Sequence, residues 1–115
     1  MRWILALAPL AMGCASYNIP ASHVQAPSAS IAWAEQAGAG SVPGASERLS
    51  LAKQELASAN KMAHHGDKRR ADLMYLRADA DAQLALATAQ DHTVASEAQQ
   101  LDQQIKQLQS TPSTR

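Results

Sequence analysis

The 115-residue chain has no phenylalanine, only one cysteine, and no excess of charge of either sign. A single cysteine excludes a disulfide within the chain. If Arg2 is removed, nine of the ten Lys and Arg remain against ten Asp and Glu, and this balance does not favour nucleic acid as a partner. Hydrophobic residues make up 46%, but most are alanine, which favours helix and buries little area. We expect one small domain with a thin core and closely approaching helices.

Catalytic patterns are also missing. The sequence has no glycine-rich phosphate loop and no serine or cysteine nucleophile in a recognisable setting. Asp79 and Asp81 fall on different sides of a helix, and Arg77 is spaced to pair with Asp81. The sequence therefore predicts a protein that is not an enzyme and needs no cofactor.

The N-terminus has the pattern of an export signal. Arg2 precedes a short apolar run, and about a dozen apolar residues are too few to span a bilayer. Cys14 directly follows Gly13, in a stretch that resembles the bacterial lipobox, with Ala11 where Leu, Val or Ile is usual. We expect cleavage after Gly13 and acylation of Cys14, which would anchor the chain to a membrane. The alternative is a secreted protein with an incidental cysteine.

Ala15 follows the cysteine, where aspartate is the common signal for inner-membrane retention. The expected location is therefore the periplasmic face of the outer membrane of a Gram-negative bacterium. Two prolines and no charge in residues 15–27 indicate a flexible tether. The predicted division is a signal peptide (1–13), the lipidated cysteine and tether (14–27), a helical domain (28–109) and a disordered tail (110–115).

Two helices are predicted in the first half of this domain. A short one starts at Ser28 or Ser30 and ends before the glycines at 38 and 40. A longer one covers 45–65 and stops at Gly66. Spacings of three and four along the longer helix predict a heptad seam of Leu49, Ala52, Leu56, Ala59 and Ala63.

A third helix is expected from an Asp67 cap to about Gln109, and the tight turn at Gly66 makes it antiparallel to the second. The predicted fold is therefore all-α: an antiparallel helical hairpin with a short N-terminal third helix and a long, partly protruding, coiled-coil-like C-terminal helix. Its predicted seam is Leu73, Leu76, Ala80, Leu84, Ala87, Asp91, Val94, Ala98, Leu101, Ile105 and Leu108.

The third helix is too long for its partners. At about 1.5 Å per residue it measures roughly 65 Å, and the second helix roughly 30 Å. The distal part of its seam, formed by Val94, Ala98, Leu101, Ile105 and Leu108, would have no partner in the same chain. We interpret these residues as an intermolecular coiled-coil surface, for self-association or for a partner helix. The alternative is a break near residues 91–93 that folds the helix back.

Three smaller features invite a functional interpretation. His64, His65 and Asp67 are the densest group of possible metal ligands, but histidines in the last turn of a helix also complement its dipole, so no metal site is predicted. The cations at 68–70 could contact lipid headgroups or an acidic partner, or could simply form a solvated turn. Trp33 is expected to cover the alanine seam.

Several segments, in their order, resemble a family of small alanine-rich bacterial lipoproteins. They are SIAWAEQAGA (30–39), VP (42–43), LSLAKQELASA (49–59), GD (66–67) and ADADAQLA (78–85). That family is defined by a domain of unknown function, which some members place ahead of an OmpA-like peptidoglycan-binding domain. The resemblance implies a helical domain at the cell envelope and supplies no active-site residue. The sequence to Arg115 contains no OmpA-like segment, so direct peptidoglycan binding is not expected.

The function expected from these observations is a non-enzymatic envelope lipoprotein that acts as a helical structural or adaptor element facing the periplasm. Two other functions remain open. One is an accessory subunit that docks its coiled-coil seam on an envelope transport or secretion assembly. The other is a small metal-binding module. The expected partners are the membrane, through Cys14, and either a second copy or another envelope protein.

Overall fold

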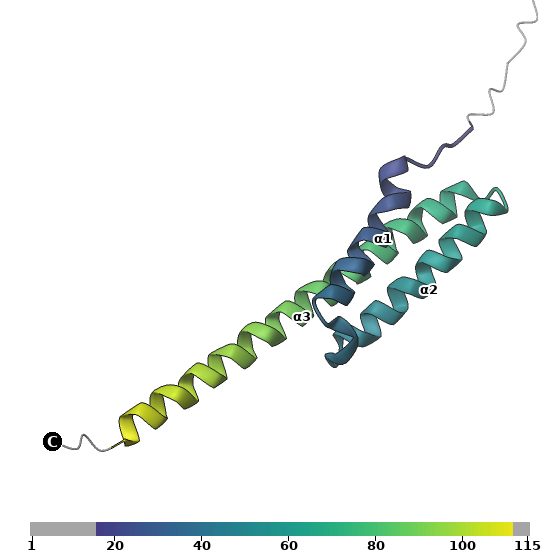
Figure 1. Cartoon of the computed structure of the whole chain (residues 1–115). Helices are drawn as coiled ribbons and strands as arrows, with labels where there is room; N and C mark the ends of the chain where they lie inside the picture. Colours follow the sequence, from purple (N-terminus) through teal and green to yellow (C-terminus); the bar gives the residue numbers. More distant parts are fainter. Residues whose placement is uncertain (1–15, 112–115) are drawn as a thin grey trace, which may run out of the picture.

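The computed structural model describes residues 16–111. This part of the chain forms α1 (Ala21–Gln36), a short 3-10 helix η1 (Ala39–Ser41), α2 (Ala45–His64) and α3 (Lys68–Ser110). α2 and α3 lie antiparallel, α1 packs mainly against α3, and α3 continues far beyond both (Figure 1). The predicted all-α hairpin with a short N-terminal helix and a long protruding C-terminal helix is confirmed.

α1 begins well inside the segment predicted to be a tether. It starts at Ala21 and contains Pro27, which is fully buried. Because proline has no N–H, the carbonyl of His23 loses its helical partner, a loss that normally disfavours helix. Contacts with α3 outweigh it here: His23 Nδ1 lies 2.7 Å from Asp72 Oδ1, and Ser30 Oγ lies 2.5 Å from Asp79 Oδ1. The predicted tether of 14–27 is therefore wrong for residues 21–27.

The turn between α2 and α3 is close to the prediction. Gly66 has φ +84°, the left-handed conformation that glycine tolerates best. Its N–H donates to the carbonyl of Ala63 at 3.1 Å, and the N–H of Asp67 donates to that of Met62 at 2.9 Å. This is a Schellman ending, which closes the last carbonyls of α2 and reverses the chain. Asp67 precedes α3, but its side chain makes no capping hydrogen bond.

The face of α3 that enters the core differs from the predicted seam. Leu73, Leu76 and Leu84 are 69%, 43% and 47% exposed, and Trp33 of α1, which was expected to cover the core, is 57% exposed. Small residues take the core positions because α1 and α2 both approach α3, and leucines there would force the helices apart. The buried hydrophobic residues of α3 also follow spacings of four and three, and they are Ala71, Tyr75, Ala78, Ala82, Ala85 and Ala89.

α2 uses the seam that the sequence predicts. Leu49, Ala52 and Ala59 are buried, and Leu56 and Ala63 are half-buried against the core. Together with the alanines of α3 they form a narrow apolar layer that ends near Ala89. Beyond that residue α3 stays helical without a break to Ser110, so the alternative in which it folds back near 91–93 is excluded.

Candidate functional site

The most extensive functional feature is an apolar stripe on the outer side of α3. At about 100° per residue, its positions centre roughly 160° around the helix from the buried alanines, so neither α1 nor α2 covers it. Every position of the stripe is exposed, from the first turns of α3 to the last. We call this surface the α3 stripe: Leu73, Leu76, Ala80, Leu84, Ala87, Asp91, Val94, Ala98, Leu101, Ile105 and Leu108.

The distal half of the α3 stripe contains the residues predicted as a partner-binding seam. Val94 is 65% exposed, and Leu108 is 76% exposed. Leu101 and Ile105 are similarly open, and Ala98 lies between them on the same face. The structure therefore brings all five residues onto one unpaired surface. The unpaired surface is also longer than predicted. The positions from Leu73 onward, which were expected to lie in the core, are exposed and belong to it.

A shallow, largely apolar groove lies beside the α3 stripe at the point where its distal half begins. The groove has a volume of about 570 Å³ and lies between the end of α1 and α3, lined by Ala37, Gln90, Thr93 and Val94. Val94 belongs to both the groove and the stripe. A helix that packed on the distal stripe would therefore find a recess at the point where α3 leaves the bundle.

The charges along the distal part of α3 are mostly negative. Asp91 lies within the stripe, and Glu97 and Asp102 stand beside it. Lys106 is the only Lys or Arg between residues 78 and 110, and its Nζ lies 2.6 Å from Asp102. A partner of this surface would therefore meet an aliphatic row with acidic side chains in it and along it.

The hairpin tip is a second candidate site, and it is basic. Lys68, Arg69 and Arg70 are consecutive and exposed at the first turn of α3. We call these three residues the basic tip. Arg70 lies 3.6 Å from the carboxylate of Asp67, a loose pair between exposed side chains that contributes little binding energy. The other two cations have no carboxylate within ion-pair distance in the described structure.

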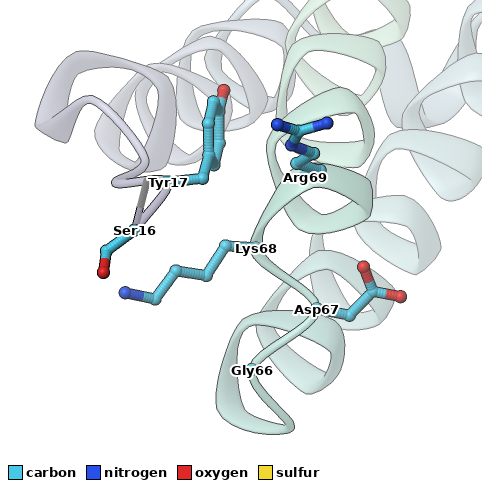
Figure 2. A pocket seen from close by; sticks show the side chains of 6 residues that line it. All are labelled: Ser16, Tyr17, Gly66, Asp67, Lys68 and Arg69. Atoms are coloured by element: carbon cyan, nitrogen blue, oxygen red, sulfur yellow. The ribbon is translucent and has the colours of Figure 1, made fainter. Parts of the chain in front are cut away.

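The segment before α1 docks against this tip. Tyr17 donates a hydrogen bond to Asp72, and the guanidinium of Arg69 lies 5.8 Å from the centre of the Tyr17 ring. Figure 2 shows Lys68 extending beside Ser16, whereas Asp67 points to the other side of the turn. A groove of about 440 Å³ is lined by Ser16, Tyr17, Gly66, Asp67, Lys68 and Arg69.

Asp72 connects α3 to the segment before α1 and to the first turn of α1. Its carboxylate accepts hydrogen bonds from Tyr17 and, on the other oxygen, from His23 Nδ1 at 2.7 Å. The bond from Tyr17 and then the bond from His23 hold the pKa of Asp72 below its usual value, and the same contact raises the pKa of the Tyr17 phenol. This cluster was not predicted from the sequence, because the predicted seam placed Leu73 toward the core, whereas Leu73 is exposed and its neighbour Asp72 is buried.

A buried charge network joins α2 to α3. Glu55 is only 5% exposed; Oε1 lies 2.5 Å from Arg77 Nε, and Oε2 has no hydrogen-bond partner among the described residues. Arg48 donates to Asp81 at 3.0 Å. Burial raises the pKa of Glu55, the carboxyl of Asp81 raises it further, and Arg77 opposes both. The predicted pair of Arg77 with Asp81 is wrong. Arg77 pairs instead with Glu55 on α2, because a buried carboxylate without a cation beside it would be costly.

The weak metal candidates do not come together. The rings of His64 and His65 meet edge to face with centroids 6.0 Å apart, both histidines are exposed, and the Asp67 carboxylate lies near Arg70. Within residues 16–111, no group of three or more His, Cys, Asp or Glu is placed to hold a metal ion. Cys14, the predicted lipidation site, lies outside the described residues.

No helix among the described residues is both long and apolar enough to cross a bilayer. Comparisons of the chain with protein-family models, with curated proteins and with solved structures find no match. The features of this chain that point to a function are therefore the α3 stripe, the basic tip and the sequence pattern at the N-terminus.

Proposed function

We propose that this chain is an envelope lipoprotein, acylated at Cys14 and held on the periplasmic face of the outer membrane, and that α3 serves as a docking arm for a helical partner. The export pattern of 1–13, the lipobox-like position of Cys14 and the residue Ala15 support the anchor and its location. The resemblance to alanine-rich envelope lipoproteins agrees with this location. In this role the protein is an adaptor, not an enzyme.

The observation that carries the proposal is the unpaired α3 stripe. Its large aliphatic side chains lie in water, although burying one such side chain is favourable by about 1.5–3 kcal/mol. Heptad spacing places them in a single row, the arrangement that a second helix covers in a coiled coil. From Leu73 to Leu108 the row is about 50 Å long at 1.5 Å per residue.

The docking of Tyr17 suggests how the arm is oriented. Three Cα–Cα steps separate Cys14 from Tyr17, so the two Cα atoms lie at most about 11 Å apart at 3.8 Å per step. An acyl group on Cys14 would therefore keep the hairpin tip beside the membrane. α3 has 43 residues, about 65 Å at 1.5 Å per residue, and its distal half would stand farthest from the lipid surface.

We infer that the occupant of the distal stripe is a helix of another envelope protein with Lys or Arg beside its own aliphatic row. Two copies anchored in the same membrane would pair in parallel and in register. This arrangement would face Asp91 with Asp91 in the seam and bring Glu97 near Asp102 across it, which disfavours pairing. A basic partner helix would instead neutralise these carboxylates. An accessory role in an envelope transport or secretion assembly is one form of this function.

Site-specific photo-crosslinking in cells tests the proposal. A crosslinking residue at Leu101 of the lipoprotein should trap one defined protein, identified by mass spectrometry. Gln103 is also exposed, but it lies on the side of α3 that continues the alanine face. A crosslinker there is the matched control and should trap little. Equal trapping at both positions, or none from Leu101, would contradict the docking surface.

Analytical ultracentrifugation separates a partner from self-association. The mature chain carrying Cys14→Ser should sediment as a monomer over a wide concentration range. A concentration-dependent dimer, abolished by Leu101→Asp and unaffected by Gln103→Asp, would keep the stripe as an interface but replace the foreign helix with a second copy.

A further inference from the structure

We propose that the basic tip is a binding surface for anionic phospholipid headgroups, and that this contact helps α3 to stand away from the membrane. The orientation rests on the proposed acylation of Cys14, but the binding of the basic tip to lipid does not. The surface consists of Lys68, Arg69 and Arg70, together with the groove that Tyr17 closes.

The local charge at this end favours an anionic surface. Between residues 61 and 70 there are four cations, Lys61 and the basic tip, and one carboxylate, Asp67. Asp67 is one of the residues that line the groove, but its carboxylate extends to the opposite side of the turn from the Lys68 side chain and lies 3.6 Å from Arg70 (Figure 2). Asp72, the next carboxylate along α3, is buried and already accepts hydrogen bonds from Tyr17 and His23. This end of the molecule therefore carries a net positive charge, because one exposed carboxylate stands against four cations.

The apolar side chains beside these cations suit a lipid surface rather than a soluble anion. Arg70 and Arg77 flank a groove of about 390 Å³ that is lined by Met62, Leu73 and Met74. Leu73 is 69% exposed at its edge. Cationic heads next to exposed aliphatic side chains match the boundary between phosphate headgroups and acyl chains. A free phosphate or an extended acidic peptide would bind the cations but would leave these apolar side chains in water.

The charge distribution along α3 supports an upright orientation. The cations gather at its start, whereas Asp91, Glu97 and Asp102 are spread along its distal half. A negatively charged membrane attracts the first end and repels the second. Tyr17, which follows the predicted anchor by three residues, contacts Asp72 and Arg69 at the attracted end. Lipid contact at the tip and a partner on the distal stripe would therefore use opposite ends of one helix.

Vesicle co-sedimentation tests the lipid contact without the acyl group. The mature chain carrying Cys14→Ser should bind phosphatidylcholine vesicles that contain about 30 mol % phosphatidylglycerol, and it should not bind pure phosphatidylcholine. Each cation near an anionic surface strengthens binding about fivefold, so Lys68→Gln with Arg70→Gln should weaken it about twenty-five-fold. Circular dichroism would verify that the variant keeps its helices.

A matched control removes two cations from elsewhere. Lys53 pairs with Glu35 on the flank of the bundle, and Lys106 pairs with Asp102 far from the tip. Replacing both with Gln should leave vesicle binding within about twofold of the parent, because neither lies at the contact surface. An equal loss in the control and the tip variant, or binding to neutral vesicles, would overturn the proposal.

The orientation has its own test in the acylated chain. A fluorophore on His65→Cys should be quenched by headgroup-attached quenchers in anionic vesicles, and one on Gln107→Cys should not. Equal quenching at both positions would mean that α3 lies flat on the surface and would overturn the upright arrangement. Mass spectrometry of the same sample reports acylation directly, and co-sedimentation requires neither the acyl group nor a partner. Failure of the lipid contact can therefore be distinguished from failure of the anchor or of the docking arm.

Discussion

α3 passes through two environments, and its two halves use side chains in opposite ways. In the bundle, up to about Ala89, its buried hydrophobic residues are alanines and one tyrosine, whereas Leu73, Leu76 and Leu84 are exposed. Between residues 90 and 111 no side chain is buried, although the helix continues to Ser110. The difference shows that most of the larger aliphatic residues of α3 do not hold this chain together; Leu86, which packs against the core, is an exception. The others are kept on a surface that the chain itself does not cover.

Amide hydrogen exchange should give the largest contrast between these halves. Amides at 78–89 lie in a packed bundle and should open only with the bundle as a whole. A helix of about twenty residues without tertiary contacts is marginal in water, so amides at 94–108 should exchange about a thousandfold faster. Similar protection in both halves would mean that the distal half is already covered, and adding the partner should raise protection only there.

Enlarging an alanine should affect the two halves differently. Ala82 is fully buried between helices, and Ala82→Leu should lower the free energy of unfolding by about 1–3 kcal/mol through overpacking. Ala98→Leu adds the same atoms on the exposed stripe and should change it by less than about 0.5 kcal/mol. Thermal unfolding followed by circular dichroism measures both. A large loss from Ala98→Leu would contradict an uncovered stripe.

The hairpin could be predicted from the sequence because its signals are local. Gly66 ends one periodic segment, Asp67 opens the next, and a left-handed glycine can close a Schellman turn whatever surrounds it. The length of α3 followed from the absence of Gly and Pro before Pro112.

The core face of α3 could not be predicted by choosing the larger side chains. Its alanines and its leucines both repeat at spacings of four and three, and only the distance between the helices decides which row is buried. The start of α1 was missed for a similar reason, since Pro27 argues against helix locally and is outweighed by contacts with α3. The distal seam was found because a long helix with short neighbours must leave part of itself uncovered.

The buried carboxyl of Glu55 makes the stability of the bundle depend on pH. Its pKa is raised by burial, so the folded state holds this proton more strongly than the unfolded state does. As the pH rises from the usual glutamate pKa through the raised one, this group therefore contributes a progressive loss of stability. Glu55→Gln removes that loss, so the free energy of unfolding of the variant minus that of the parent should increase over this interval. Urea titrations between about pH 4 and pH 7 measure it, and a constant difference would contradict the raised pKa.

The smallest expected effect lies at the hairpin tip, where Asp72 has the opposite pKa shift. Hydrogen bonds from Tyr17 and His23 lower its pKa, so it stabilises the folded state above the usual aspartate pKa and loses that contribution as the pH falls through the lowered value. Asp72→Asn should remove this acid-side loss and release the Tyr17 phenol, whose raised pKa should return toward its usual value. Absorbance titration of the phenolates follows Tyr17, with Tyr75→Phe as the background that leaves one titrating tyrosine. An unchanged Tyr17 titration in Asp72→Asn would mean that Tyr17 is not docked on α3, and the link between the N-terminal segment and the basic tip would have to be abandoned.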